Sequence, residues 1–151
     1  MNYTIKHSFW DAKTELLRDG HVIGSIESSG FLGYTTTGYL HDKVFTFANR
    51  GVFSSRTEIF DHCNNLIGDI EYAKWSSKAE VDLNGLKYYW KPSNFWATKW
   101  ILEDQYNNEI HLAKNEFSVN YSTYEDNEFL FLLATFLLFN HHRKLTASGA
   151  A

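Results

Sequence analysis

Two adjacent histidines, His141 and His142, are the first residues to consider for chemistry, because imidazole binds metals and transfers protons near neutral pH. Neighbouring residues on a helix point about 100° apart, so a metal site would need a further ligand such as His62 or His111. No spacing in the sequence brings these residues together. We favour the other interpretation, in which the histidines and the two basic residues after them place positive charge at a helix C-terminus. We therefore predict no metal and no cofactor.

Three aspartates and one cysteine are the other candidates for catalysis. Asp61, Asp82 and Asp104 each lie in or near a predicted turn, where an aspartate commonly accepts hydrogen bonds from its own backbone, so we interpret them as structural. Cys63 is the only cysteine and has no neighbour in the sequence that would activate its thiol. The chain contains no Gly-x-Ser-x-Gly motif, no phosphate-binding glycine loop and no zinc-ligand spacing. We predict a non-catalytic protein, with an enzyme of unrecognised type as an alternative.

Charge and composition argue against several classes of function. The formal net charge is −4, and no run of Lys and Arg is longer than the pair Arg143-Lys144. Nucleic-acid binders usually carry a clustered basic face, so we expect no nucleic acid as a partner. The longest apolar run, Phe129 to Phe139, has 11 residues, whereas a membrane span needs about 20, so we expect no transmembrane segment. The first residues contain no apolar stretch of the signal-peptide kind, and we expect a cytoplasmic protein.

The elements that must position any site are mostly short β-strands. Aromatic residues make up 17% of the chain, and aromatic side chains favour the half-buried surface of a sheet. Apolar and polar residues alternate in many short segments, for example at 3–9, 79–83 and 117–122, and clusters of Gly, Asn and Asp separate them. The dipeptide Asn84-Gly85 is typical of a two-residue hairpin. The pattern predicts about twelve antiparallel strands in one mainly β domain, arranged as a barrel or a sandwich.

A single helix is predicted near the C-terminus, over residues 125–143. Ser122-Thr123-Tyr124-Glu125 has the form of a capping box, which begins a helix. From Phe129 to Phe139 the helix would be apolar on every side, and such a helix has to be surrounded by other parts of the protein. The single domain would span residues 1–145, followed by a flexible tail at 146–151. We therefore predict a core helix whose buried side chains include Phe129, Leu130, Leu133, Phe136 and Leu137.

Two predicted hairpins share a short repeat. Segment 17–26 ends in Ile23-Gly24-Ser25-Ile26, and segment 60–70 ends in Ile67-Gly68-Asp69-Ile70, each after an acidic turn. Segment 102–112 is a looser third copy that lacks the glycine. A glycine inside a strand weakens it and often marks a place where another group approaches the backbone closely. The repeat therefore indicates a specific packing role for Gly24 and Gly68.

The short strands, the two Ile-Gly-x-Ile hairpins and the final apolar helix together resemble the tubby C-terminal-like superfamily. This superfamily includes the tubby domain, the phospholipid scramblases and the LURP-one-related proteins. The resemblance covers residues 3–144 and is closest to the small LURP-one-related members. It implies a closed antiparallel β-barrel of about twelve strands around a central hydrophobic C-terminal helix. On this basis we expect Gly24 and Gly68 to point inward and leave room for the bulky helix side chains, so that valine at either position would destabilise the fold by about 1–3 kcal/mol.

The resemblance implies a non-catalytic binding or adaptor domain at a membrane or lipid surface, with a phospholipid or a protein as partner. Tubby domains bind phosphoinositide head groups through basic residues on the barrel, and no matching cluster allows that site to be carried over. The sequence also lacks the calcium loop and the cysteine-rich segment of scramblases. Phe95 and Trp96, which follow Pro92, are our candidates for an exposed aromatic contact. An alternative is a lipocalin-like barrel that carries a small apolar ligand, which requires an empty interior.

Overall fold

The computed structural model describes residues 2–8, 12–29, 35–51, 54–120 and 127–147, with side chains through residue 145. These residues form twelve β-strands followed by one α-helix, α1 (Glu128–Ala147). The strands are β1 (Tyr3–Ser8), β2 (Lys13–Arg18), β3 (His21–Ser29), β4 (Thr35–Leu40), β5 (Lys43–Arg50), β6 (Arg56–Phe60), β7 (Leu66–Tyr72), β8 (Ala79–Leu83), β9 (Leu86–Pro92), β10 (Lys99–Asp104), β11 (Glu109–Ala113) and β12 (Glu116–Val119).

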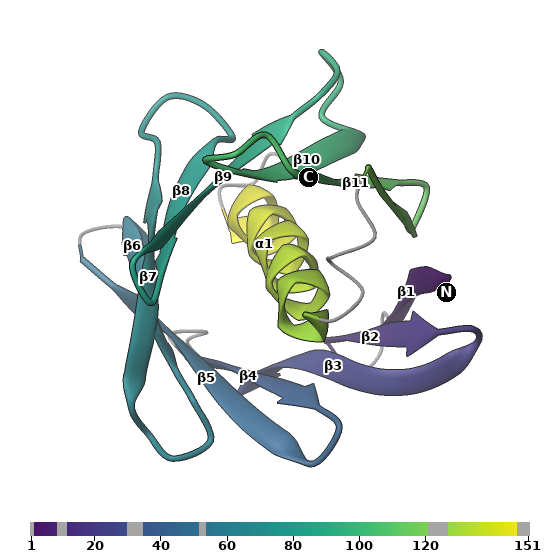
Figure 1. The fold of residues 1–151 in the computed structure, drawn as a ribbon. Helices are drawn as coiled ribbons and strands as arrows, with labels where there is room; N and C mark the ends of the chain where they lie inside the picture. Colours follow the sequence, from purple (N-terminus) through teal and green to yellow (C-terminus); the bar gives the residue numbers. More distant parts are fainter. Residues whose placement is uncertain (1, 9–11, 30–34, 52–53, 121–126, 148–151) are drawn as a thin grey trace.

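The twelve strands form one closed barrel (Figure 1). Each strand pairs antiparallel with the next strand along the chain, and β1 pairs with β12 through Thr4 and Glu116 to close the ring. The mainly β fold, the closed antiparallel barrel of twelve strands and the C-terminal helix are therefore confirmed. Because consecutive strands run in opposite directions, their connections alternate between the two ends of the barrel.

The strands form where apolar and polar residues alternate, because successive side chains point to opposite faces of a sheet. In β8, Ala79, Val81 and Leu83 are buried, whereas Glu80 is exposed on the outside. Strands β1, β2, β10 and β11 also have buried residues at alternate positions. The inward-facing side chains of the barrel thus converge on one hydrophobic core.

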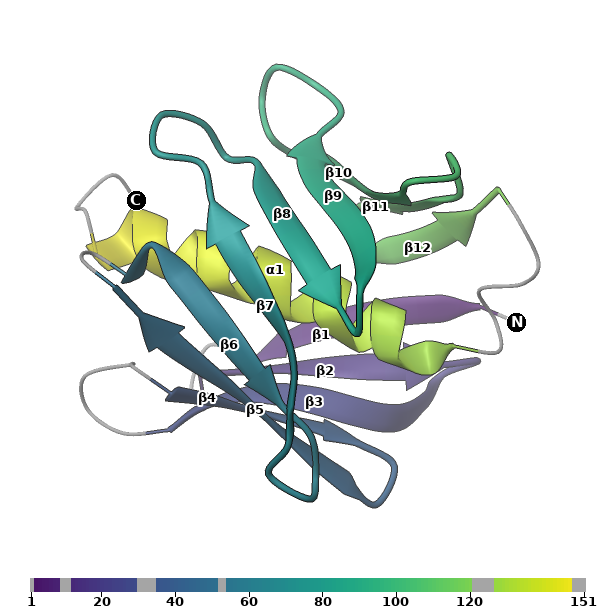
Figure 2. The same cartoon turned by 60° about the vertical axis from the view of Figure 1, so that its left-hand side comes forward.

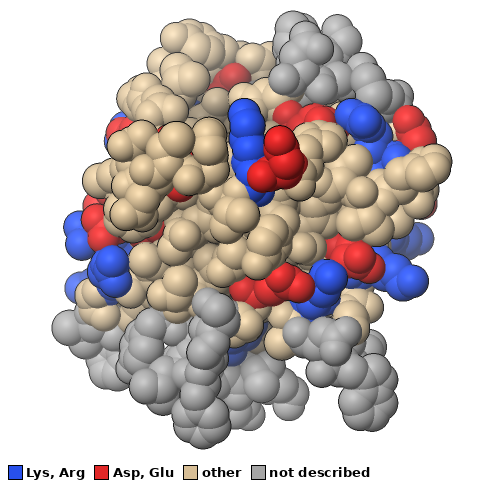
Figure 3. All heavy atoms as spheres, turned by 90° about the horizontal axis from the view of Figure 1, so that it is seen from below, with Lys and Arg blue, Asp and Glu red and all other residues tan. Residues whose placement is uncertain are grey.

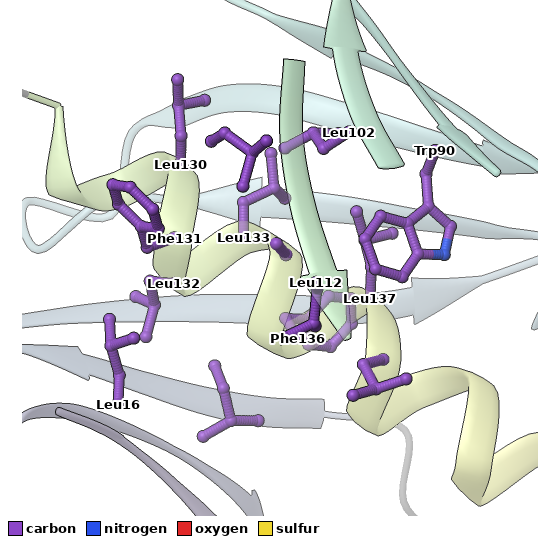
Figure 4. Close-up of a cluster of buried hydrophobic side chains, with 14 of the residues drawn as sticks. Leu16, Trp90, Leu102, Leu112, Leu130, Phe131, Leu132, Leu133, Phe136 and Leu137 are labelled. Atoms are coloured by element: carbon purple, nitrogen blue, oxygen red, sulfur yellow. The ribbon is translucent and has the colours of Figure 1, made fainter. Parts of the chain in front are cut away.

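Helix α1 lies inside the barrel (Figures 1 and 2). Its side chains from Leu130 to Leu137 are at most 2% exposed, and they belong to the same core as Leu16 and Leu102 of the strands (Figure 4). Phe129 is partly buried against this core. A helix that is apolar on every side is stable where the protein surrounds it, and the barrel does so here. Because α1 occupies the interior, the empty barrel that the lipocalin-like alternative requires is not observed.

The bounds of α1 differ from the predicted ones. The helix begins at Glu128 and continues to Ala147, past the predicted end at residue 143 and into the predicted tail. Contacts of Lys144 with the Ser54 carbonyl and the Tyr72 ring hold this additional turn against the barrel. The predicted capping box at 122–125 lies outside the described residues. Within the described part of the chain, no helix is long and apolar enough to cross a membrane.

Glu128, the first residue of α1, attaches the helix to three parts of the barrel. Its Oε2 accepts hydrogen bonds from the Tyr3 hydroxyl at 2.9 Å and from Arg18 Nη1 at 2.7 Å, and its Oε1 lies 2.7 Å from His41 Nε2. Partial burial opposes ionisation of the carboxyl group, but the hydrogen bonds and the charge of Arg18 outweigh it and lower the pKa of Glu128. Burial and the same carboxylate raise the pKa of Tyr3 to about 12. The contacts therefore anchor the first turn of the helix as an ionised carboxylate.

The two repeat glycines have a packing partner that the sequence did not predict. Gly24 and Gly68 each align with buried core residues of the neighbouring strand, so both point inward as expected. A Cβ on Gly24 would meet the carbonyl oxygen of Tyr39, and one on Gly68 would meet that of Asp82. The backbone of the next strand, rather than α1, excludes a side chain at these positions. The expectation that they make room for the helix is therefore wrong.

Gly38 of β4 is a glycine that does face α1. A Cβ on Gly38 would lie 2.8 Å from Phe47 Cε2 and 3.3 Å from Leu132 Cδ2. The sequence contains a signal for this position, because Thr36, Gly38 and Leu40 occupy alternate, buried positions of one strand. The small residue at this position of β4 thus leaves room for Phe47 of β5 and also for Leu132 of α1.

Candidate functional site

The two ends of the barrel differ in charge. Residues 73–78 between β7 and β8 and residues 93–98 between β9 and β10 lie at the end where α1 finishes (Figure 2). Together with residues 141–147 of α1, these segments contain Lys74, Lys78, Arg143 and Lys144 but neither Asp nor Glu, and we call them the basic end. The turns at the opposite end contain or adjoin an aspartate in five places, at Asp19, Asp42, Asp61, Asp82 and Asp104.

A cavity of about 840 Å³ opens at the basic end, and we call it the basic pocket. Its walls come from residues 73–78, from Trp90 of β9 and from the C-terminal part of α1 between Leu137 and Leu145. None of the described residues that line it is Asp or Glu. Its volume lies within the range of small-molecule sites in proteins. The basic pocket is therefore the candidate site of this protein.

One wall of the basic pocket is aromatic. Trp90 is buried and stacks on Trp100, with ring centroids 4.8 Å apart and planes 8° from parallel. The His141 ring also packs against Trp100 in an edge-to-face arrangement, with ring centroids 4.7 Å apart. Trp75, in the β7–β8 loop, also lines the pocket and is 96% exposed. The pocket thus combines a fixed apolar wall with an aromatic rim that water reaches.

Two partly buried cations lie near the pocket: Lys144 lines it, and Arg143 precedes Lys144 in the helix and contacts Asn140 of the pocket wall. Lys144 Nζ donates a hydrogen bond to the Ser54 carbonyl oxygen at 3.1 Å and lies 3.4 Å from the centre of the Tyr72 ring. Burial and the charge of Arg143 lower the pKa of Lys144 to about 8, and burial also lowers the pKa of Arg143. Among the described residues, neither side chain forms an ion pair with a carboxylate. The protein therefore holds two positive charges here without a described counter-ion.

Hydrogen-bonding side chains replace apolar ones in the core beside the pocket. The Thr57 hydroxyl donates to Asn49 Oδ1 at 2.7 Å and lies 2.8 Å from the Tyr72 hydroxyl, and burial raises the pKa of Tyr72. Asn140, which lines the pocket, is 1% exposed. Its Oδ1 accepts a hydrogen bond from Arg143 Nη2 at 2.6 Å, but its Nδ2 has no partner among the described residues. We did not predict these buried polar side chains from the sequence, although Asn140 follows directly after the apolar run of the helix.

His141 and His142 do not act as the predicted charges of the helix end. Burial, reinforced by the charge of nearby groups, lowers the pKa of both imidazoles. At neutral pH the positive charge of the helix end therefore resides on Arg143 and Lys144. The described residues contain no group of three or more His, Cys, Asp and Glu that could hold a metal ion.

The aromatic residues predicted to be exposed, Phe95 and Trp96, stand at the tip of the β9–β10 loop. They are 91% and 78% exposed, and their rings pack edge to face at 5.2 Å. Asn94 shapes the loop, because its Oδ1 accepts hydrogen bonds from the backbone amides of Thr98 and Lys99 at 3.0 and 3.2 Å. The exposure agrees with the sequence analysis, and contact with a partner stays a prediction.

The other residues considered for chemistry have structural roles. Asp61, Asp82 and Asp104 accept hydrogen bonds from backbone amides of their own turns at 2.8–3.0 Å, as their position in the sequence predicted. Cys63 is a free, exposed cysteine in the β6–β7 turn. The structure thus brings none of these residues into the basic pocket.

Other parts of the surface carry charges of both signs. On the face shown in Figure 3, Lys and Arg lie next to Asp and Glu, with uncharged residues between them. A smaller cavity of about 440 Å³ adjoins the basic pocket and shares Tyr72, Ala73, Lys78 and Trp90 with it, but it is also lined by Lys91 and by three glutamates, Glu71, Glu80 and Glu103. A surface of mixed charge favours neither an anion nor a cation. The basic pocket is therefore distinguished from its neighbour by the lack of acidic residues in its described lining.

Comparison of the chain with protein families, with curated proteins and with solved structures gives no match. The function is therefore argued from the geometry and charge of the basic end.

Proposed function

We propose that this chain is a non-catalytic binding domain of the tubby-like, LURP-one-related type that acts at an anionic lipid surface. The observation that carries the proposal is the basic end, where Trp75, Phe95 and Trp96 are exposed beside lysines and without an acidic residue in the same segments. In a chain whose net charge is −4, these segments form a local excess of positive charge at one end of the barrel. Such a domain would approach an anionic surface with its basic end.

The physical chemistry of the exposed residues supports a lipid surface. Tryptophan and phenylalanine rings partition into the boundary between head groups and acyl chains, where their apolar area leaves water. Each Lys or Arg near an anionic membrane adds about 1 kcal/mol of attraction, which falls off within a Debye length. Lys74 and Lys78 flank Trp75 in sequence, so that charge and aromatic area lie in one loop. Because anionic lipids face the cytoplasm, the proposal includes a cytoplasmic location.

The tubby-like part of the proposal rests on architecture. A closed barrel of twelve antiparallel strands around a buried C-terminal helix is the arrangement that the resemblance implies. Architecture alone does not specify a ligand, since one fold can carry many functions. The lipid surface is therefore argued from the basic end and not from the fold.

A flotation experiment with vesicles tests the proposal. We expect the protein to float with vesicles that contain phosphatidylserine, to float less with neutral vesicles and to be released by high salt. The variants Phe95→Ser and Trp96→Ser should reduce flotation, because they remove exposed aromatic area without changing the core. Tyr106→Ser is the matched control, since Tyr106 is 69% exposed in a turn at the opposite end. Failure to associate with any vesicle would discard the membrane surface and leave a protein partner as the alternative.

A further inference from the structure

We infer that the basic pocket binds one amphipathic anion, with its carboxylate or phosphate head group at Lys144 and Asn140 and its apolar chain along Trp90 and Leu137. The inference deepens the proposed function, because it places a single lipid-like molecule inside the end of the barrel that faces the membrane. Three features of the pocket support this ligand: a cation, a buried amide without a partner among the described residues, and an apolar wall.

Lys144 lines the basic pocket and is positioned to bind an anion there. Its ammonium group has three N–H donors, and one of them donates to the Ser54 carbonyl oxygen. The ammonium group also lies over the Tyr72 ring. Keeping a cation partly buried without a counter-ion is unfavourable, and an anionic oxygen in the pocket would relieve this cost. Arg143 adds positive charge beside it but is occupied by Thr36 and Asn140. Lys144 is therefore the principal contact for the head group.

Asn140 supplies a second donor. Because Arg143 Nη2 donates to its Oδ1 at 2.6 Å, the orientation of the amide is determined and Nδ2 is the atom left over. Nδ2 is buried and has no hydrogen-bond partner among the described residues. An unsatisfied buried donor typically destabilises a protein by about 1–3 kcal/mol. A ligand atom that accepts a hydrogen bond from Nδ2 would remove this cost. A head-group oxygen between Lys144 and Asn140 would satisfy both.

The remaining wall accommodates an apolar chain rather than a second charged group. Trp90 is held flat by its stack on Trp100, and Leu137 and Leu145 of α1 line the same pocket. No Asp or Glu among the described lining residues would attract a cation or a zwitterionic amine. The volume of about 840 Å³ exceeds what a bare phosphate ion fills. The combination of two donors at one place and an extended apolar wall fits a molecule with one anionic head group.

Calorimetric titration with short-chain amphiphiles tests the inference. Decanoate, decyl phosphate, decanol and inorganic phosphate are titrated separately, below the concentrations at which the amphiphiles form micelles. We expect decanoate and decyl phosphate to bind with one-to-one stoichiometry, and decanol and inorganic phosphate to bind at least about tenfold more weakly, which corresponds to about 1.4 kcal/mol. Equal binding of decanol would show that the pocket does not select the anion, and equal binding of inorganic phosphate would show that the apolar wall plays no part.

Two isosteric variants locate the head group. Lys144→Met and Asn140→Leu keep the shape of the side chains, and each should weaken decanoate binding by about tenfold while leaving decanol binding unchanged. Lys87→Met is the matched control, because Lys87 pairs with Asp82 at the opposite end of the barrel. Thermal melting of each variant verifies that it is folded. Unchanged decanoate affinity in a folded Lys144→Met variant would overturn the inference.

The two proposals fail in different ways. A protein that floats with anionic vesicles but binds no decanoate refutes the pocket ligand and retains the membrane surface. A protein that binds decanoate but does not float refutes the membrane surface and retains the pocket ligand. Phe95→Ser separates them further, since Phe95 does not line the pocket and its loss should leave decanoate binding unchanged.

Discussion

Gly24 of β3 and Gly68 of β7 occupy equivalent places in two β-bulges of the barrel. The pairing with the preceding strand shifts by one residue beside each glycine, so that Ile23 and Ile67 are the extra residues. The carbonyl oxygens of both isoleucines accept a hydrogen bond from the next hairpin turn, at 2.7 and 2.9 Å. The sequence repeat thus corresponds to a structural repeat, in which a bulge increases the bend of the strand and lets the next strand approach the glycine.

The bulges predict a graded effect of alanine at three glycines. Gly24→Ala and Gly68→Ala should each lower the free energy of unfolding by about 2–3 kcal/mol, because the new Cβ meets a backbone carbonyl that cannot move aside. Gly38→Ala should lower it by only about 1 kcal/mol, since the Phe47 and Leu132 side chains can shift. Urea denaturation of the three variants measures these values. A larger loss for Gly38→Ala would contradict the view that side chains yield more readily than a backbone carbonyl at these sites.

Removal of the Glu128 carboxylate should detach the first turn of α1. We expect Glu128→Gln to destabilise the protein by about 1–3 kcal/mol, because Tyr3, Arg18 and His41 all lose an ionised acceptor. The pKa of Tyr3 should fall from its raised value near 12, which ultraviolet titration can follow. Glu109→Gln is the control, since Glu109 forms a more exposed pair with His111. Equal losses in the two variants would argue against a special role for Glu128.

Acid should destabilise the C-terminal end of the helix. Burial lowers the pKa values of His141 and His142 in the folded state, so the unfolded chain binds protons more readily below about pH 6.5. Stability should therefore fall as the pH decreases from 7 to 5. A double variant with His141→Gln and His142→Gln should show a weaker pH dependence in this window. Chemical denaturation of the wild type and of the double variant at several pH values measures the two slopes, and equal slopes would contradict the prediction.

Lys144 should show a pH dependence of the same sign as the two histidines, but at alkaline pH. Its pKa of about 8 lies below the unfolded value, so the unfolded chain binds more protons between about pH 8 and 10.5, and the lysine destabilises the native state less as the pH rises. The free energy of unfolding of the wild type, relative to Lys144→Met, should therefore increase over this range. Hydrogen bonding to Asp82 raises the pKa of Lys87 instead, so the free energy of unfolding of the wild type, relative to Lys87→Met, should stay level over this range and decline only above about pH 10.5. Chemical denaturation at several pH values provides both comparisons.

Local patterns in the sequence were sufficient for most of the fold. Alternation in segments such as 79–83 predicts strands because side chains in a strand alternate between the faces of a sheet. The apolar run of the helix predicts burial because an element that is hydrophobic on every side has to be surrounded. Asp61, Asp82 and Asp104 could be assigned to turns because the bonds of a short turn are made to its own backbone. These effects all act over a few residues.

The candidate site depended on contacts that no local pattern encodes. Tyr72 and Lys144 belong to different elements and meet only because β7 forms the barrel wall beside the last turns of α1. The orphan amide of Asn140 is likewise a property of its surroundings, since an exposed asparagine would bond to water.

The sequence by itself determined that short strands alternate with turns and that one apolar helix must be covered. It also determined that Gly24 and Gly68 are special, but not what approaches them. Only the tertiary structure decided that the partner is the carbonyl group of the adjacent strand, and that the basic segments gather at one end around a pocket. The physical reason is that periodicity and turn chemistry are short-range, whereas strand register and the depth of α1 in the barrel are set by the packing of the whole chain.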